Sequence, residues 1–140
     1  MKEVRESYFE AKHDTSIDAI MVDWLTNVTS EEYKTGMYHI VNLLKANPTG
    51  TLLVNTVNLG VVSNEDHLWS QTEWLQQVLA AGLKTTVMIT SSDILAQMAL
   101  DDVVEGVKSA SNNRVEVHYF DNKVDARSWL IKRAESVSSS

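Results

Sequence analysis

The 140-residue sequence contains no cysteine, a single proline and only five glycines. Without cysteine there is no disulfide, no thiolate nucleophile and no zinc or iron–sulfur site held by sulfur. Neither a GxGxxG run nor a P-loop occurs, so the phosphate-cradling glycine motifs are missing as well. No apolar segment approaches the roughly 20 residues that a membrane span requires, so we expect no membrane insertion.

Basic clusters are also missing, and the formal net charge is -7. Nucleic acids and anionic membrane surfaces select basic patches, so we expect neither as a partner. The first twelve residues, MKEVRESYFEAK, are charged and lack the apolar stretch of a secretory signal, which favours a cytoplasmic location. The composition, with 44% hydrophobic and 22% charged residues, is typical of a globular domain. We expect one domain over residues 1–137 and a disordered serine tail over 138–140.

Strand-like and helix-like segments alternate along the chain. Apolar or alternating runs predict strands over 4–12, 17–25, 51–57, 84–90 and 114–120, the first two paired as an antiparallel hairpin. Apolar periodicity predicts helices that begin near Thr29, near Asn64, at Ser92 or Asp93 and at Asp121. These helices end near residues 46, 81, 108 and 137. The order predicts an α/β fold with about five strands in a mixed, mostly parallel sheet, four helices and an N-terminal hairpin.

An ordered set of short segments resembles the SpoIIAA-like fold, in particular the bacterial STAS and SEC14-type domains. The set consists of Val22-Asp23-Trp24, Glu31-Glu32-Tyr33, Val62-Ser63-Asn64-Glu65-Asp66 with Trp69, Glu73-Trp74, Gly82-Leu83-Lys84, and Phe120-Asp121 with Ala126, Trp129 and Leu130. It extends from about residue 5 to 133. The better-known relatives are anti-sigma factor antagonists, regulatory domains of anion transporters and SEC14-like lipid carriers. The resemblance therefore implies a bacterial protein without catalytic activity.

Ser63 is the candidate regulatory residue. In the antagonists a serine at the start of this helix is phosphorylated, but the matching position here is Asn64, and Ser63 lies one residue earlier. We expect Ser63 to cap the helix, with Asp66 three residues on. A phosphate would meet repulsion from Glu65, Asp66 and Glu73, so we weigh the cap above the switch.

The sequence predicts no catalytic residue, metal site or cofactor. Ser63, Asp66 and His67 are the residue types of a hydrolase triad, but they lie within one helical turn and fan apart. The histidines at 13, 39, 67 and 118 have no HxH or HxxxH spacing. An enzyme with His67 or His118 as base would need a pocket that joins one of them to carboxylates.

Aromatic and sulfur side chains outside the helical stripes form the predicted binding surface. On a regular helix Leu68, Leu75, Val78 and Leu79 share one face, Trp74 flanks it, and Trp69 points roughly 140° away. Ile94 and Met98 lie similarly off the core face of the third helix. Trp69, Trp74, Ile94 and Met98 would form one apolar patch if the two helices are neighbours, and the alternative is that other segments bury them.

The favoured hypothesis is a non-enzymatic regulatory domain that offers this helix surface to a protein partner or to a second copy as a homodimer. The alternative is a carrier or sensor of a small apolar, lipid-like ligand, which needs a closed apolar pocket of about 300 Å³ or more.

Overall fold

The computed structural model describes residues 3–60, 62–91 and 115–138, with side chains through 133. Its six strands form one sheet in the order β1 to β6: β1 (Glu3–Glu6), β2 (Phe9–Asp14), β3 (Ala19–Trp24), β4 (Thr51–Asn55), β5 (Thr85–Ile89) and β6 (Glu116–Phe120). β1, β2 and β3 pair antiparallel, and β3 to β6 pair parallel. The α/β class and the mixed, mostly parallel sheet are confirmed, with one strand more than expected.

Three helical segments appear in the described part of the chain: α1 (Ser30–Ala46), a continuous run of α2 (Asn64–Trp69), η1 (Ser70–Trp74) and α3 (Leu75–Ala80), and α6 (Lys123–Ser138). The helix expected from Ser92 or Asp93 to residue 108 lies outside the described residues. α6 continues to Ser138, one residue into the expected tail, and residues 139–140 also lie outside the described part.

The expectation of one strand over residues 4–12 is wrong, because the chain turns at Ser7 and Tyr8 and makes two strands. In a single strand, Tyr8 and Phe9 would point to opposite faces of the sheet. The turn allows both to enter the core, where they are 8% and 0% exposed. Neither glycine nor asparagine marks the turn, so its usual sequence signal is missing.

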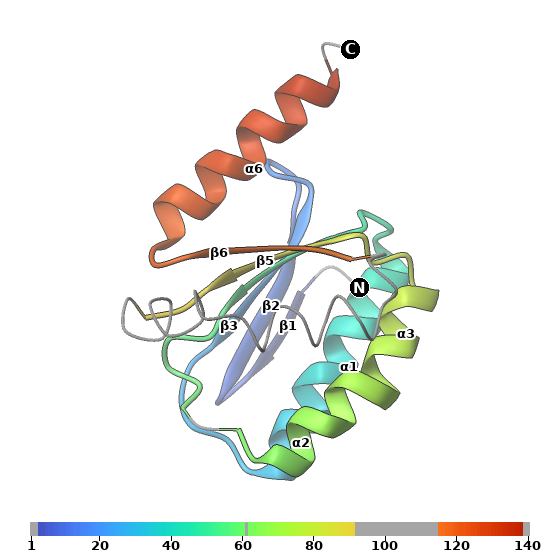
Figure 1. Ribbon diagram of the computed structural model, residues 1–140, viewed down its shortest axis with the longest axis vertical. Coiled ribbons are helices and arrows are strands. Elements are labelled where there is room, and N and C mark those ends of the chain that lie inside the picture. The colour runs from blue at the N-terminus through green and yellow to red at the C-terminus, as the bar shows by residue number, and fades with distance from the viewer. Residues whose placement is uncertain (1–2, 61, 92–114, 139–140) are drawn as a thin grey trace.

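Helices cover the two faces of the sheet unequally. Among the described helices, α1, α2 and α3 lie together on one face and α6 lies on the other (Figure 1). The first face carries the larger core, which includes Phe9, Trp24 and Ile40. The second carries a smaller cluster that includes Leu53, Val87 and Leu130. β4 contributes alternate residues to both cores, which explains its uninterrupted apolar run.

Side-chain caps mark where the helices begin. Thr29 and Glu32 form the expected capping box of α1, each side chain bonded to the other's backbone N–H. At α6, the side-chain oxygen of Asn122 accepts the N–H of Asp125 at 2.8 Å. The expected cap at Asp121 is therefore wrong by one residue, and α6 begins at Lys123.

α1 approaches the sheet most closely at Gly36. A Cβ atom at this position would lie 2.5 Å from Cη2 of Trp24 and 3.1 Å from Cδ2 of Phe9. Trp24 is 2% exposed and packs edge-on against Phe9, with ring centroids 4.8 Å apart. The missing side chain of Gly36 thus sets the distance between α1 and β3.

We expect Gly36→Ala to lower the free energy of unfolding by roughly 1–3 kcal/mol, because the added methyl group forces α1 away from Trp24. Asn42→Ala, an exposed change on the same helix, controls for helix propensity and should alter stability by less than about 0.5 kcal/mol. Urea unfolding followed by circular dichroism measures both. Equal stability of the two variants would contradict the close-packing argument.

Candidate functional site: an aromatic surface on α1 and α2

The helix after β4 contains a π turn, which changes which side chains face the core. In η1 the N–H of Leu75 bonds to the carbonyl of Ser70, five residues earlier. A π turn is wider than an α turn and advances less than the usual 100° per residue. Asp66, Ser70, Trp74 and Val78, at intervals of four, are all buried or partly buried as a result.

Because of this wider turn, the burial predicted for a regular helix is wrong at two positions. Leu68, expected in the buried stripe, is 62% exposed. Trp69, expected to point away from the core, is partly buried and packs against the larger core cluster. Leu75 and Val78 are buried as expected. The predicted core face is therefore wrong only for α2, which precedes the π turn. The π turn contains more residues than an α turn, so it rotates α2 relative to α3.

Trp69 is held by side chains of α1. Its indole meets Tyr33 and Tyr38 edge-on, with ring centroids 6.3 Å and 5.5 Å apart. The ammonium of Lys34 lies 5.5 Å from the centroid of the same indole, within the range of a cation–π contact. Tyr33 is buried, whereas Tyr38 is 42% exposed. Trp69 therefore contacts both a buried and an exposed side chain of α1.

Trp74 is fixed by one directed hydrogen bond. Its indole Nε1 donates to the backbone carbonyl of Met37 in α1 at 2.8 Å. Trp69 and Trp74 are five residues apart, so a π turn between them lets both contact α1. Both predicted residues, Trp69 and Trp74, therefore pack against α1. Ile94 and Met98 lie outside the described residues, so the four-residue patch stays a prediction.

Sequence reasoning missed the exposed part of this surface. We name the α1–α2 surface after Lys34 and Tyr38 of α1, which contact Trp69 of α2, together with exposed Leu68, the residue that precedes Trp69. Lys34 and Tyr38 are one helical turn apart on α1, off the buried face that begins at Tyr33 and continues at Met37. That i, i+4 spacing was the available signal.

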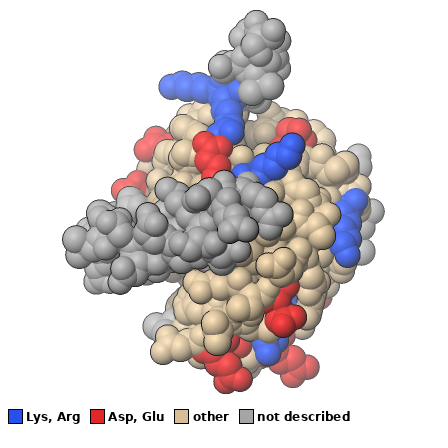
Figure 2. All heavy atoms as spheres, turned by 45° about the vertical axis from the view of Figure 1, so that its right-hand side comes forward, with Lys and Arg blue, Asp and Glu red and all other residues tan. Residues whose placement is uncertain are grey.

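Acidic side chains lie at one end of this pair of helices. Glu31 and Glu32 occupy the first turn of α1, and Glu65 and Asp66 occupy the first turn of α2. Figure 2 shows carboxylates gathered at the lower end of the molecule, where both helices begin in Figure 1. Negative charge complements the helix dipole there. An anionic group would be repelled at this end.

Ser63 caps α2 as predicted. Its hydroxyl accepts the N–H of Asp66 at 3.2 Å. The carboxylate of Asp66 instead accepts the hydroxyl of Ser30 at 2.7 Å, which ties the start of α2 to the start of α1. Ser63 is exposed and Asp66 is 6% exposed. These bonds give both residues structural roles.

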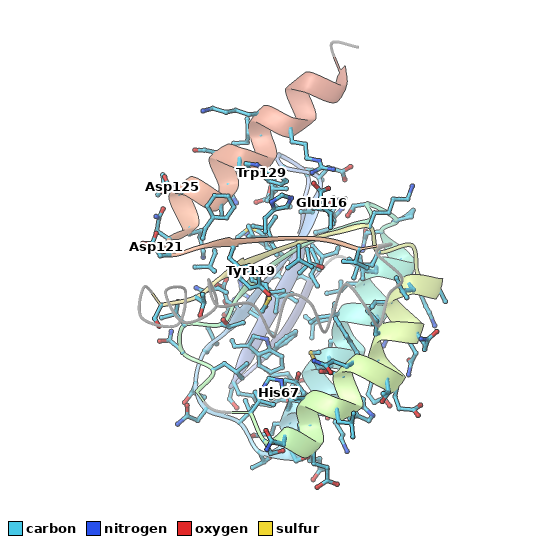
Figure 3. The ribbon with its side chains drawn as sticks, in the orientation of Figure 1. His67, Glu116, Tyr119, Asp121, Asp125 and Trp129 are labelled. Carbon is cyan, nitrogen blue, oxygen red and sulfur yellow. The ribbon has the colours of Figure 1, made fainter. Side chains whose placement is uncertain are left out.

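The histidines considered as bases lie apart. Figure 3 places His67 on α2, far from Glu116 and Trp129 at the other end of the view. His118 Nε2 lies 2.8 Å from Glu116 Oε1, and its ring packs at a tilt of 40° against Trp129, with centroids 4.2 Å apart. Trp129 is partly buried and packs against the smaller core. Within the described residues, His, Asp and Glu side chains form no group of three suited to a metal ion.

Arg133 completes the contacts of Glu116. Its guanidinium lies 2.6 Å from Glu116 Oε2. The hydrogen bonds from Arg133 and His118 lower the pKa of Glu116 to about 2. Glu116 is therefore a fixed anion that links β6 to α6.

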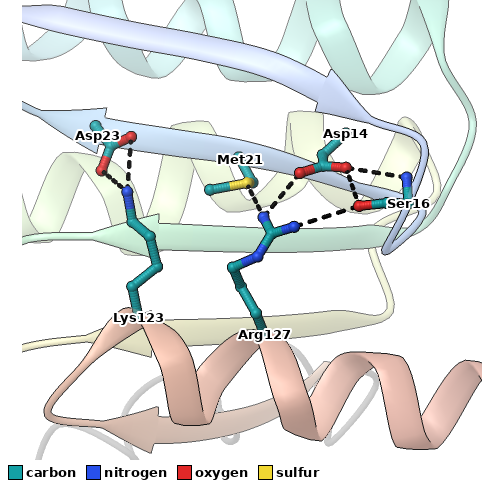
Figure 4. A network of polar contacts seen from close by, with 6 residues as sticks. All are labelled: Asp14, Ser16, Met21, Asp23, Lys123 and Arg127. Carbon is teal, nitrogen blue, oxygen red and sulfur yellow. Dashed lines mark hydrogen bonds and ion pairs between the residues drawn. The ribbon is translucent and has the colours of Figure 1, made fainter.

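Ion pairs also hold α6 against the antiparallel strands. Arg127 donates to Asp14 at 2.8 Å, and the ammonium of Lys123 lies 3.2 Å from Asp23 (Figure 4). Partial burial tends to raise the pKa of Asp14, but hydrogen bonds from Ser16 and Arg127 outweigh it and lower the pKa to about 2. Polar contacts thus supplement the few apolar contacts that α6 makes with the sheet.

An open hollow of about 140 Å³ adjoins the Lys123–Asp23 pair. Charged residues of both signs dominate its lining, which consists of Glu3, Arg5, Glu10, Ala11, Lys12, Met21, Asp23 and Lys123. A hollow of this size and polarity does not match the closed apolar pocket that a lipid carrier needs.

The chain matched no protein-family model, no curated protein and no solved structure. No described helix has the length and apolar character to cross a membrane.

We expect deletion of Thr72, an exposed residue within η1, to preserve the packing of Trp69 and Trp74. The deletion brings them to an i, i+4 spacing, so a regular α-helix keeps both on α1. Stability should change by less than about 1.5 kcal/mol. Tryptophan fluorescence and urea unfolding measure the result.

Deletion of Asn42, an exposed residue in the regular helix α1, is the matched control. It rotates Leu43 and Leu44 by about 100° relative to Ile40, so we expect unfolding. Equal damage from the two deletions would contradict the role assigned to the π turn.

Stability should fall as the pH drops from about 4.5 to about 2. Asp14 and Glu116 have folded pKa values of about 2, below their ordinary 3.8 and 4.5, so the unfolded chain binds more protons across this window. Their contribution is fully present above the ordinary values and is lost as the pH falls toward the folded ones. Urea unfolding at successive pH values should show a shallower decline for Asp14→Asn and Glu116→Gln. An unchanged slope in both variants, with exposed Glu73→Gln as control, would contradict the assignment.

Proposed function

We propose that this chain is a bacterial, cytoplasmic interaction domain without catalytic activity that binds a protein partner through the α1–α2 surface. The observation that carries the proposal is the combination of exposed Leu68 and Tyr38 with Trp69. Aromatic residues are enriched at protein interfaces, and tryptophan and tyrosine dominate their energetics. Lys34 adds a charge beside the aromatic groups, as at the polar rim of many interfaces.

The SpoIIAA-like resemblance supports the same proposal. An α/β fold with a mixed sheet agrees with such a domain, and the known relatives include regulatory domains that act by binding other proteins. Ser63 and Asp66 favour this function over hydrolysis, because Ser63 caps α2, Asp66 bonds to Ser30, and the neighbouring His67 side chain is exposed. The charged hollow beside Lys123 gives the lipid-carrier alternative no support.

Aspartate substitutions test the surface. We expect Leu68→Asp and Tyr38→Asp to reduce partner recovery by about tenfold or more, because a charge would be buried at the contact. The circular dichroism spectrum should stay unchanged, since both side chains are exposed. Trp69→Asp should have the same effect on binding with some added loss of stability. Quantitative affinity purification from the native cells measures recovery, and sedimentation velocity measures self-association.

Val124→Asp is the matched control, because Val124 is 73% exposed on α6, on the other face of the sheet. It should bind like the parent chain. If Leu68→Asp and Tyr38→Asp also behaved like the parent in both measurements, the α1–α2 surface would not be the binding site.

A further inference from the structure

The outer side of β1 is an edge with a defined pattern of backbone groups. Among the described strands, β1 pairs only with β2. The carbonyl of Tyr8 accepts the N–H of Leu25 at 2.9 Å, so the backbone of Tyr8 faces toward β3. Backbone direction alternates along an antiparallel strand, so Phe9 and Ala11 face β1.

The register between β2 and β1 determines in which direction the backbone groups of β1 point. Glu6 and Val4 are opposite Phe9 and Ala11, and they exchange hydrogen bonds with them. Glu3 and Arg5 must then direct their N–H and carbonyl groups outward. The edge of β1 is therefore a short template for one more strand, with donors and acceptors at these two residues.

The side chains of β1 alternate between the two faces of the sheet. Glu3 and Arg5 lie on the face of the hollow, where Arg5 Nε donates to Glu3 Oε1 at 2.6 Å. Their side chains are 50% and 73% exposed, so both remain within reach of another molecule. Val4 is on the opposite face and packs against the larger core.

These features limit how a second copy can add to the edge. In an antiparallel pair related by a two-fold axis, three registers place outward-facing residues opposite each other. The first pairs Glu3 with Glu3 of the second copy, and the second pairs Arg5 with Arg5, so both bring like charges together. The third pairs Glu3 with Arg5 and, by symmetry, Arg5 with Glu3, and it places Val4 opposite Val4.

We propose that two copies of this chain associate through β1 in this third register, which joins their sheets into one. Opposite charges meet twice on one face, and two valines meet on the other. Cross-strand pairs of both kinds stabilise antiparallel sheets. The contact involves three residues of each strand, so the dimer is weak and salt-sensitive. This surface is distinct from the α1–α2 surface, and neither proposal requires the other.

Charge exchange tests the register. We expect the parent chain to dimerise reversibly in sedimentation velocity at protein concentrations up to about 1 mM. Arg5→Glu and Glu3→Arg should each weaken the dimer by about tenfold or more, because each places like charges opposite one another twice. The double variant Glu3→Arg with Arg5→Glu restores both pairs and should recover the parent affinity. Lys132→Glu, on the exposed side of α6, should have no effect beyond general charge repulsion.

Amide hydrogen exchange gives a second readout that does not depend on substitutions. The Arg5 amide should gain protection as protein concentration rises, whereas the Val4 and Glu6 amides, bonded to β2, should be protected at every concentration.

A parent chain that stays monomeric at about 1 mM would overturn the proposal. A dimer unaffected by either single reversal would also overturn it, and so would a dimer dissociated by Leu68→Asp while the Arg5 amide exchanges freely. Such a result would assign self-association to the α1–α2 surface.

Discussion

The contact between Trp24 and Gly36 determines how the rest of the first layer assembles. Trp24 ends β3 inside the larger core, and only a residue without a side chain fits against its ring on α1. This close approach positions α1 on the sheet. The carbonyl of Met37, next to Gly36, then receives the indole N–H of Trp74. The position of the second helical run therefore depends on α1, and through α1 on one tryptophan ring.

The π turn allows two tryptophan side chains to pack against α1, which a regular helix would not allow. Two indoles five residues apart would lie on different faces of an α-helix, and only one could pack against α1. The wider turn brings both to the same side and exposes Leu68. The hydroxyl groups of Ser70 and Thr72 in η1 donate to the backbone carbonyls of His67 and Leu68 in α2, which stabilises the irregular hydrogen-bond pattern. π turns often occur at functional sites, and here the turn creates the α1–α2 surface.

The two faces of the sheet are stabilised by different interactions. The α1 side relies on continuous apolar packing, whereas α6 combines a small apolar cluster with ion pairs to Asp14, Asp23 and Glu116. Charged residues on β1 and β2 make the second face polar beside α6. Its edge strand also alternates glutamate with arginine, so the same charges that protect the edge against unspecific pairing select one register.

Local patterns in the sequence determined the elements and their class. The capping box at Thr29, the cap at Ser63 and the apolar runs of β4 and β5 depend on near neighbours, so they could be predicted. The break after Glu6, the π turn and the exposure of Leu68 depend on contacts with residues distant in the chain. No local sequence signal marks these three features. Tyr8 is buried by contacts with distant parts of the chain, and Trp69 contacts Tyr33 and Tyr38 only when α1 is in place. The sequence by itself thus determined an α/β fold with capped helices, and the tertiary structure decided which aromatic groups face outward, because burial depends on packing between distant segments.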